Sequence, residues 1–424
     1  MSDTPPQVVP GAWMVSSVRW SVGCAEFTAA AVFTLIALGF AVAPHLLPDF
    51  YIYRLGSELA LRGQSPYDLA TIRRHVAQQF PDPEPTADSF VNNCGYFLPP
   101  QALIVFAPFA VLPWGVAKIA WALLQGAAAL AIARVPRLWL AASLVGQPAP
   151  IGRWLPFFLL VNFLTLGVAM VGQTTLLTTG CIAAGLWCWS RSTRWGFWPG
   201  ILLWSVPFIK PHVALPLIAV AWFVGGWKRA AALVGVVVAF NLLGSWLVSD
   251  SPRFVRDYLN FLRDSHHAVA FNQAARNYEI TSWNRLLFVT TDRLMAQPVV
   301  IEQTATITLA AYGVWLGVVL VRCALGGVKP AATWVLAAGV VGSVGCPQVL
   351  GYEALVLVLT VPWIRDLFAA GWGGWGTVAA LVLGFQALPI QVLAPLGFDF
   401  HRPLGVAVLA GVVWVGLLPA TDSR

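Results

Sequence analysis

The scarcest feature of this sequence is charge. Only 10% of its 424 residues are Asp, Glu, Lys or Arg, whereas 58% are hydrophobic and the mean hydropathy is +0.74. A water-soluble globule could not bury so much apolar surface, because charged residues cover most of the outside of such proteins. The composition therefore excludes a soluble protein and indicates a polytopic integral membrane protein.

Cysteine and nucleotide-binding motifs are also scarce. The six Cys are scattered, with no Cys-x-x-Cys pair and no nearby His at ligand spacing, which argues against a zinc site or a disulfide framework. There is neither a Walker loop nor a Gly-x-Gly-x-x-Gly fingerprint after a strand. We therefore expect no metal site and no cofactor. The net charge of +7, on so few charged residues, suits contact with membrane lipids better than with nucleic acid.

Long apolar runs make up most of the chain, and they predict an all-α fold with about 12 transmembrane helices. The first run follows Arg19 with no Ala-x-Ala cleavage site after it, so we expect a retained helix. Residues 1–18 are predicted to be a disordered cytoplasmic tail, and residues 19–424 a single polytopic domain. The runs are Ala25–Ala43, Pro99–Leu112, Gly115–Ala133, Trp154–Val171, Thr174–Trp189, Trp195–Ile209, His212–Val224, Ala230–Val248, Ala305–Val321, Ala331–Val344, Leu350–Ile364, Trp372–Leu388 and Pro403–Leu418.

Two long polar segments, approximately residues 44–98 and 249–297, interrupt these runs. Short loops rich in Arg and Lys stay in the cytoplasm, which places the loops at Arg194 and Lys228 inside. Alternating spans then carry both polar segments to the outer side. The crossings made by residues 99–144 stay open, because the run from Pro99 to Leu112 is short for a crossing.

Asp49 opens the first polar segment, directly after the first apolar run. A carboxylate at a membrane surface, flanked by Phe50, Tyr51 and Tyr53, is costly to desolvate and is a candidate functional group. The alternative is an interfacial helix that Asp49 caps and whose aromatic residues form a belt.

Cations on the outer side are candidates for binding a phosphate. An enzyme there has no access to cytoplasmic nucleotide sugars, so its activated donor must come from the membrane, for example a polyprenyl-phosphate sugar. Lys210, Arg276 and Arg285 are the candidate phosphate contacts. The alternatives are that Lys210 extends its charged end from a helix terminus and that the two arginines are ordinary surface charges.

Six short motifs stand in order along the chain: D-F-x-x-Y (Asp49–Tyr53), G-x-S-P-Y-D (Gly63–Asp68), Y-F-L-P-P (Tyr96–Pro100), G-Q-T-T-L-L (Gly172–Leu177), K-P-H (Lys210–His212) and C-P-x-x-x-x-Y-E-A-L (Cys346–Leu355). With these motifs the chain resembles glycosyltransferase family 87, whose members are membrane-embedded enzymes with the C-type glycosyltransferase fold. The chain departs from the family pattern at Cys346-Pro347, where Ser-Pro is usual, and at Tyr352-Glu353, where Tyr-Asp or His-Tyr is usual.

The resemblance implies an enzyme that moves a hexose, typically mannose, from a polyprenyl-phosphate sugar to a lipid-linked or glycan acceptor. The reaction would take place on the outer face of the membrane, which we expect to be the bacterial inner membrane. Asp49 occupies the place of the catalytic base. Its role needs one base and no general acid, because the leaving group is already a phosphate ester; a divalent metal is compatible but not required. The candidates for substrate binding are Tyr53, Tyr96, Gln173, His212, Tyr352 and Glu353.

Two other classes of protein stay open. A secondary transporter would also place polar residues between helices, but near the middle of the membrane and in both halves of the chain. A lipid-sugar ligase or flippase-like protein would share the polyprenyl donor but would not need Asp49 as a base.

The charge asymmetry generates a topology prediction. In cells carrying single-cysteine variants, a membrane-impermeant thiol reagent added from outside should label positions near Asp88 and Asp264. It should not label positions beside Arg194 and Lys228. The reverse pattern would refute the orientation, and with it the argument for a membrane-supplied donor.

Overall fold

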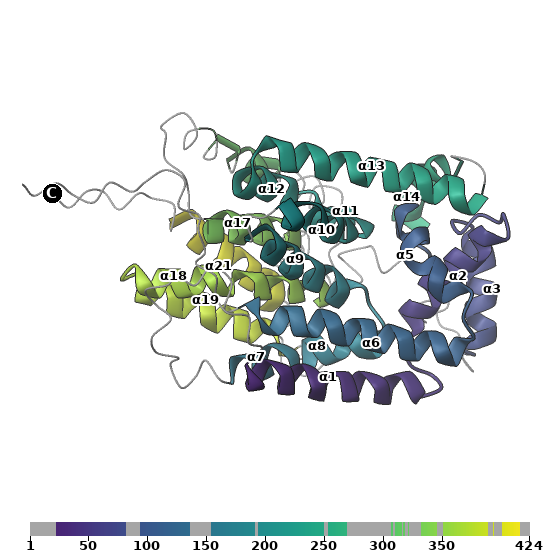
Figure 1. Ribbon diagram of the computed structural model, residues 1–424, viewed down its shortest axis with the longest axis horizontal. Coiled ribbons are helices and arrows are strands. Elements are labelled where there is room, and N and C mark those ends of the chain that lie inside the picture. Colours follow the sequence, from purple (N-terminus) through teal and green to yellow (C-terminus); the bar gives the residue numbers. More distant parts are fainter. Residues whose placement is uncertain are drawn as a thin grey trace, which may run out of the picture.

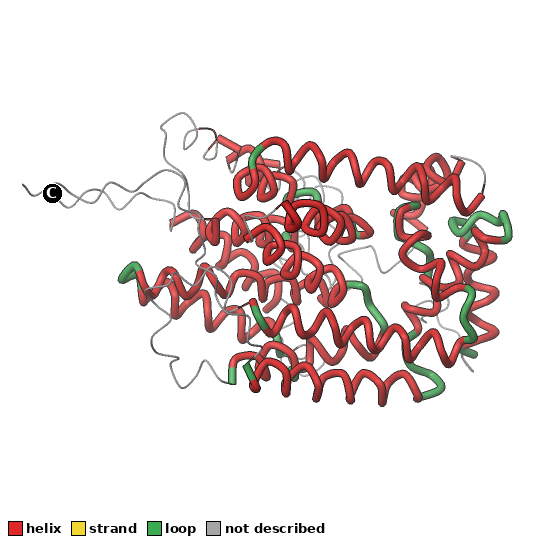
Figure 2. The backbone as a smooth tube through the Cα atoms, viewed as in Figure 1, coloured by secondary structure: helices red, strands yellow, loops and turns green. Residues whose placement is uncertain are grey.

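The computed structural model describes residues 23–81, 94–135, 154–190, 194–249, 253–268, 332–345, 351–388 and 401–415, residue 393 and short pieces between 307 and 321. All regular secondary structure in these ranges is helical, which confirms the predicted all-α class for this part of the chain (Figure 2). The predicted tail, residues 1–18, lies outside the described residues.

In chain order the helices are α1 (Cys24–Val42), α2 (Pro48–Leu61), α3 (Leu69–Gln79), α5 (Gln101–Ala110), α6 (Trp114–Ala133), α7 (Leu155–Leu160), α8 (Phe163–Val171), α9 (Thr175–Ser190), α10 (Arg194–Ser205), α11 (Pro211–Ala214), α12 (Leu217–Gly225), α13 (Trp227–Ser249), α14 (Arg253–Ala268), α17 (Ala332–Val344), α18 (Val361–Ala369), α19 (Gly373–Gln386) and α21 (His401–Val415). Two 3₁₀ helices, η4 (Val206–Ile209) and η6 (Gly351–Thr360), belong to the same set. Helix α1 runs along α6, and α2, α3, α5 and α14 gather at one end (Figure 1).

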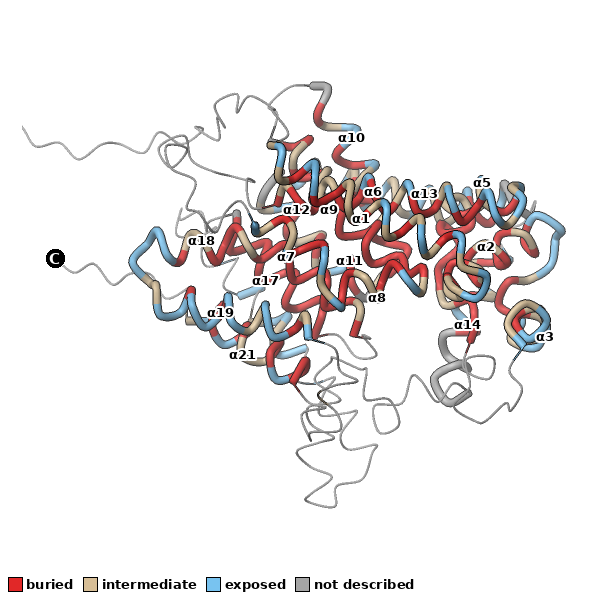
Figure 3. Tube along the Cα trace, turned by 90° about the horizontal axis from the view of Figure 1, so that it is seen from below, coloured by how far each residue is buried: buried red, intermediate tan, exposed pale blue. Residues whose placement is uncertain are grey.

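Three of these helices are long and apolar enough to cross a membrane: α1, α6 and the Trp227–Trp246 part of α13. They match the predicted runs Ala25–Ala43, Gly115–Ala133 and Ala230–Val248. Large apolar side chains stay exposed on several helices, as for Leu35 on α1 and Leu381 on α19. Exposed positions recur along α19 in Figure 3. Such a surface suits a lipid environment. The predicted total of about 12 spans stays a prediction.

The runs Trp154–Val171 and Thr174–Trp189 are not the two straight spans that the sequence predicted. Asn162 breaks the first run: its amide donates to the carbonyls of Phe158 and Leu159, and its side-chain oxygen accepts the Thr165 N–H. One side chain thus ends α7 and caps α8. Helices α8 and α9 then meet at a bend of 113°, so this pair counts as at most one broken span or as a re-entrant loop.

Helix α2 lies beside the short helix α5. The Arg54 guanidinium donates to the carbonyls of Phe109, Ala110 and Leu112, and so satisfies the carbonyl groups at the end of α5. On the same side of α2, the Phe50 ring stacks on Trp121 with centroids 4.8 Å apart. At 10 residues α5 is too short to cross a bilayer, as the sequence indicated for Pro99–Leu112.

The two predicted outer segments contact each other. Helix α14 is amphipathic, and its buried residues Phe254, Tyr258 and Phe261 recur at helical spacing. Its aromatic face meets Tyr67 of the first segment, with ring centroids 5.5 Å from Tyr258 and 5.8 Å from Phe261. The Ser65 hydroxyl also donates to the Asp257 carboxylate. Residues about 190 positions apart in sequence therefore lie in contact.

The start of α2 is held against the end of α8. Leu47, the N-cap residue of α2, has a left-handed φ of 68°, and its N–H donates to the Met170 carbonyl at 3.0 Å. Gly172 ends α8 with φ 79°, and a Cβ built on it would lie 2.7 Å from Cβ of Phe50. A non-glycine residue with positive φ is strained, and such strain concentrates at functional sites. This contact sets Gln173 beside Asp49.

Gly172 generates a stability prediction. Gly172→Ala should lower the free energy of unfolding by roughly 1–3 kcal/mol, because Ala resists the left-handed conformation and its Cβ meets Phe50. Thermal unfolding followed by Trp fluorescence in detergent would measure the loss. Gly167→Ala is the matched control in the same helix, because nothing lies within 4 Å of its Cβ position. An unfolding temperature for Gly172→Ala equal to that of the control would contradict the tight contact.

Candidate active site

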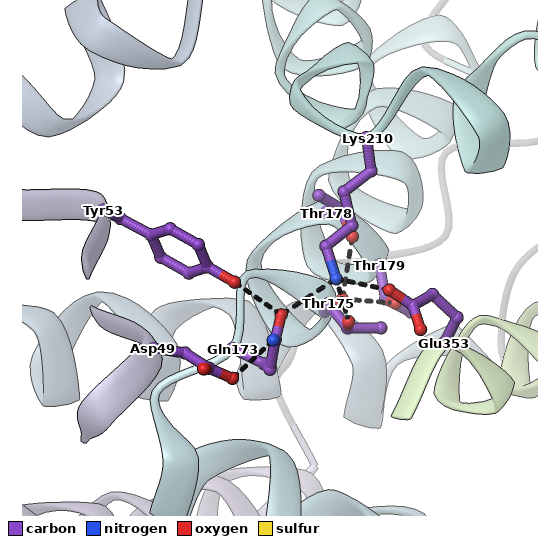
Figure 4. A network of polar contacts seen from close by, with 8 residues as sticks. All are labelled: Asp49, Tyr53, Gln173, Thr175, Thr178, Thr179, Lys210 and Glu353. Atoms are coloured by element: carbon purple, nitrogen blue, oxygen red, sulfur yellow. Dashed lines mark hydrogen bonds and ion pairs between the residues drawn. The ribbon is translucent and has the colours of Figure 1, made fainter. Parts of the chain in front are cut away.

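Gln173 is the centre of a polar network between α2, α9, η4 and η6 (Figure 4). Its Nε2 donates to Oδ2 of Asp49 at 2.5 Å, and its Oε1 accepts from the Tyr53 hydroxyl at 2.8 Å and from Nζ of Lys210 at 2.9 Å. Gln173 is 4% exposed, so water contributes little to its hydrogen bonding. The structure thus brings together four of the residues that the sequence singled out, from three separate motifs.

Lys210 stands at a break in the helical path, between the 3₁₀ helix η4 and the short helix α11. Its ammonium donates to Oε1 of Gln173, to Oγ1 of Thr175 at 3.0 Å and to Oε1 of Glu353 at 2.6 Å. An ammonium group has three N–H donors, so these three oxygens occupy all of them. The Tyr352 ring lies over the same ammonium, with its centroid 5.0 Å away.

Glu353 forms a buried ion pair with Lys210, and both side chains are at most 5% exposed. Removing two charges from water is costly, and their attraction offsets that cost only with short contacts and further hydrogen bonds. Glu353 is presented by η6, a 3₁₀ helix of 10 residues. Runs of this length are uncommon, because 3₁₀ hydrogen bonds have poorer geometry than α-helical ones.

Asp49 is half-buried and lies in the first turn of α2, where the helix dipole favours a negative charge. Leu47, and not Asp49, occupies the N-cap position, and no side chain caps this helix. The alternative interpretation of Asp49 as an N-cap is therefore wrong in its geometry.

Tyr53 enters the network as a neutral hydroxyl. Burial raises its pKa well above the ordinary value, and the charges of Asp49 and Glu353 raise it further. A phenol that keeps its proton can serve only one donor contact here, and that contact is the one to Gln173.

The other candidates from the sequence lie elsewhere or outside the description. Tyr96 is fully buried, and its ring packs on α2 where Gly56 has no side chain. His212 falls in α11, but its side chain is not among those described. Arg276, Arg285 and Cys346-Pro347 lie outside the described residues.

Two further polar residues were missed at the level of sequence. Thr175 stands within the G-Q-T-T-L-L motif, which carried the signal, and its hydroxyl accepts from Lys210. Arg73 of α3 has buried Nε and Nη2 atoms for which no described residue serves as hydrogen-bond acceptor. Burial raises the pKa of the Cys94 thiol to about 11, while Arg73 lowers it and Asp49 raises it. Arg73 and Asp49 therefore both act electrostatically on the same thiol.

Within the described ranges, no cluster of three or more His, Cys, Asp or Glu side chains could hold a metal ion. The described network consists of an acid, an amide and a lysine with its own counter-ion, groups that can accept a proton or stabilise a charge.

The all-helical structure of the described residues, with three helices long and apolar enough to cross a bilayer, indicates a membrane protein. Residues 96–350, more than half of the chain, match the family model of glycosyltransferase family 87. The chain belongs to this family, as its motifs indicated. The match includes Gln173 and Lys210, whereas Asp49 and Glu353 lie outside it. No curated protein matches the chain.

Proposed function

We propose that this glycosyltransferase moves a hexose, with mannose the leading candidate, from a polyprenyl-phosphate donor to a lipid-linked or glycan acceptor. It works among the lipids of the bacterial inner membrane, with its site facing away from the cytoplasm. Its architecture is the C-type glycosyltransferase fold, with about 12 transmembrane helices in one domain from residue 19 to 424. Family membership and the apolar helices support this proposal.

Asp49 is the general base of the proposed reaction. The acceptor hydroxyl oxygen attacks the anomeric carbon of the donor, and the bond from that carbon to the phosphate oxygen breaks. The phosphate keeps the bonding electron pair and leaves as polyprenyl phosphate, while the hydroxyl proton passes to Asp49 and then to water. One base is enough, in contrast to the carboxylate pair of a glycosidase.

The observation that carries the assignment is the Gln173–Asp49 contact. Asp49 is half-buried, so a substrate hydroxyl can approach it, yet one carboxylate oxygen is held by a fully oriented amide. Holding a base in place before the substrate arrives is what proximity and orientation require of a catalyst.

Binding of the donor phosphate requires a cation, and two candidates among the described residues are Lys210 and Arg73. Lys210 has all three of its N–H groups occupied, so the sequence-based prediction that it contacts phosphate requires an exchange with one of its present acceptors. Arg73 keeps two buried N–H-bearing nitrogens without an acceptor among the described residues. A guanidinium in that state is well suited to a phosphate oxygen pair. Arg276 and Arg285 stay candidates on the second outer segment.

Asp49→Asn tests the base. Asn has the same size but cannot accept the proton, so kcat should fall roughly 10²-fold to 10⁴-fold, with the donor KM little changed. The measurement is transfer of label from polyprenyl-phosphate mannose to membrane acceptors. Asp68→Asn is the matched control: Asp68 caps α3 through the Ala70 N–H, and Asn caps comparably. Near-normal turnover by Asp49→Asn would refute the base, and labelled lipid crossing the membrane without a new glycosidic bond would indicate a transporter.

A paired substitution tests the cations. Arg73→Met should raise the donor KM roughly 10-fold or more, because a charged hydrogen bond is worth about 1.5–3 kcal/mol. Lys210→Met should act mainly on kcat, since its ammonium holds the site together. Initial rates over a range of donor concentrations give both parameters. A higher donor KM for Lys210→Met alone would return the phosphate contact to Lys210.

A further inference from the structure

We propose that Gln173 is a positioning residue for Asp49, and that Tyr53 and Lys210 act on Asp49 through it. The inference rests on the proposed role of Asp49 as general base. In this proposal Gln173 orients the base and does not bind substrate. Tyr53 and Lys210 hold the Gln173 amide in the required orientation.

The amide of Gln173 can adopt only one orientation. Its carbonyl oxygen accepts from the Tyr53 hydroxyl and from Lys210, which fills both lone pairs. The amide nitrogen must then face Asp49. Turning the amide over would point its N–H groups at the Lys210 ammonium and its oxygen at the Asp49 carboxylate. Two donors on one end of the side chain thus decide what the other end presents to the base.

The backbone of Gln173 is fixed as well. Its N–H donates to the carbonyl of Val168 at 3.0 Å, and the N–H of Gly172 donates to the carbonyl of Ala169 at 3.2 Å. These two bonds and the positive φ of Gly172 form a Schellman motif at the end of α8. The Leu47–Met170 hydrogen bond ties this helix end to the start of α2, which carries Asp49. Backbone hydrogen bonds therefore fix the segments that carry Gln173 and Asp49 relative to each other.

Charge explains why an amide stands here. Asp49 and Glu353 are both carboxylates, and the salt bridge of Lys210 within the described part of the chain is to Glu353. Gln173 transmits a hydrogen bond from that cation to Asp49 without adding a charge of its own. Asp49 also acts electrostatically on Tyr53 of α2 and on Cys94 before α5, and Arg73 of α3 acts on the same thiol. The Gln173 amide donates a hydrogen bond to Asp49 in these surroundings, and Tyr53 and Lys210 fix the orientation of that amide.

Two substitutions of Gln173 test the proposal. Gln173→Met keeps the length of the side chain but loses the amide, and kcat should fall roughly 10-fold to 100-fold with the donor KM within about twofold. Gln173→Glu can still accept from Tyr53 and Lys210 but sets a second carboxylate against Asp49. Two adjacent carboxylates favour protonation, so the acidic limb of the kcat–pH profile should move to higher pH by about 1 unit.

A double-mutant cycle shows whether Tyr53 acts through Gln173. Tyr53→Phe alone should lower kcat several-fold, and in the Gln173→Met background it should cause no further loss. Tyr67→Phe is the matched control: Tyr67 is 7% exposed, like Tyr53, and its hydroxyl donates to the Leu98 carbonyl at 3.0 Å. Additive losses from Tyr53→Phe and Gln173→Met would overturn the inference.

The outcomes separate this inference from the proposed function. If Asp49→Asn is inactive while both Gln173 variants turn over normally with an unshifted pH profile, Asp49 stays the base and the positioning role is refuted. A raised donor KM with normal kcat for Gln173→Met would also refute it, in favour of substrate contact. Activity of Asp49→Asn would refute the proposed base itself, whatever the Gln173 variants do. Size-exclusion profiles in detergent show that each variant is folded.

Discussion

The Lys210 ammonium is the interaction on which this site depends. It lies in a nearly dry interior, and each of its three N–H groups meets an oxygen from a different residue. Those residues belong to the α8–α9 break, the first turn of α9 and η6. A buried charge that loses a partner is strongly destabilising, so the ammonium holds these segments at fixed separations. The orientation of Gln173, and through it the place of Asp49, follows from that constraint.

The network stands where helices break. In a membrane, backbone N–H and C=O groups must be satisfied within the protein, so a helix break is tolerated where neighbouring segments and polar side chains satisfy the freed groups. Here α8 and α9 are separated at Gln173, the helical path turns at Lys210, and η6 replaces α-helix with 3₁₀ helix at Glu353. Each break frees space for one polar side chain. The breaks and the buried charges therefore depend on one another.

The sequence predicted some elements well and others poorly, for identifiable reasons. Composition and run length are enough for α1, α6 and α13, because lipid-facing helices need only be apolar and long. Hydrophobicity could not show the break at Asn162 or the 3₁₀ form of η6, since capping and tertiary contacts decide both. Asp49, Gln173, Lys210 and Glu353 were each recognisable as polar residues in apolar surroundings. Their meeting depends on helix packing, and Arg73 escaped notice because it stands in a polar segment where a cation is ordinary.

The balance of formal charge bears on how a donor could bind. Among the residues of the network, Asp49 and Glu353 carry two negative charges and Lys210 one positive charge, so the site is negative before substrate arrives. The proposed polyprenyl-phosphate donor would bring a further negative charge, and the departing phosphate would gain another. At short range in a poorly solvated site, such like charges repel strongly. Lys210 is already neutralised by Glu353. The proposed donor phosphate would therefore require a cation from outside the network, and Arg73 is one described residue with buried donors that no described acceptor occupies.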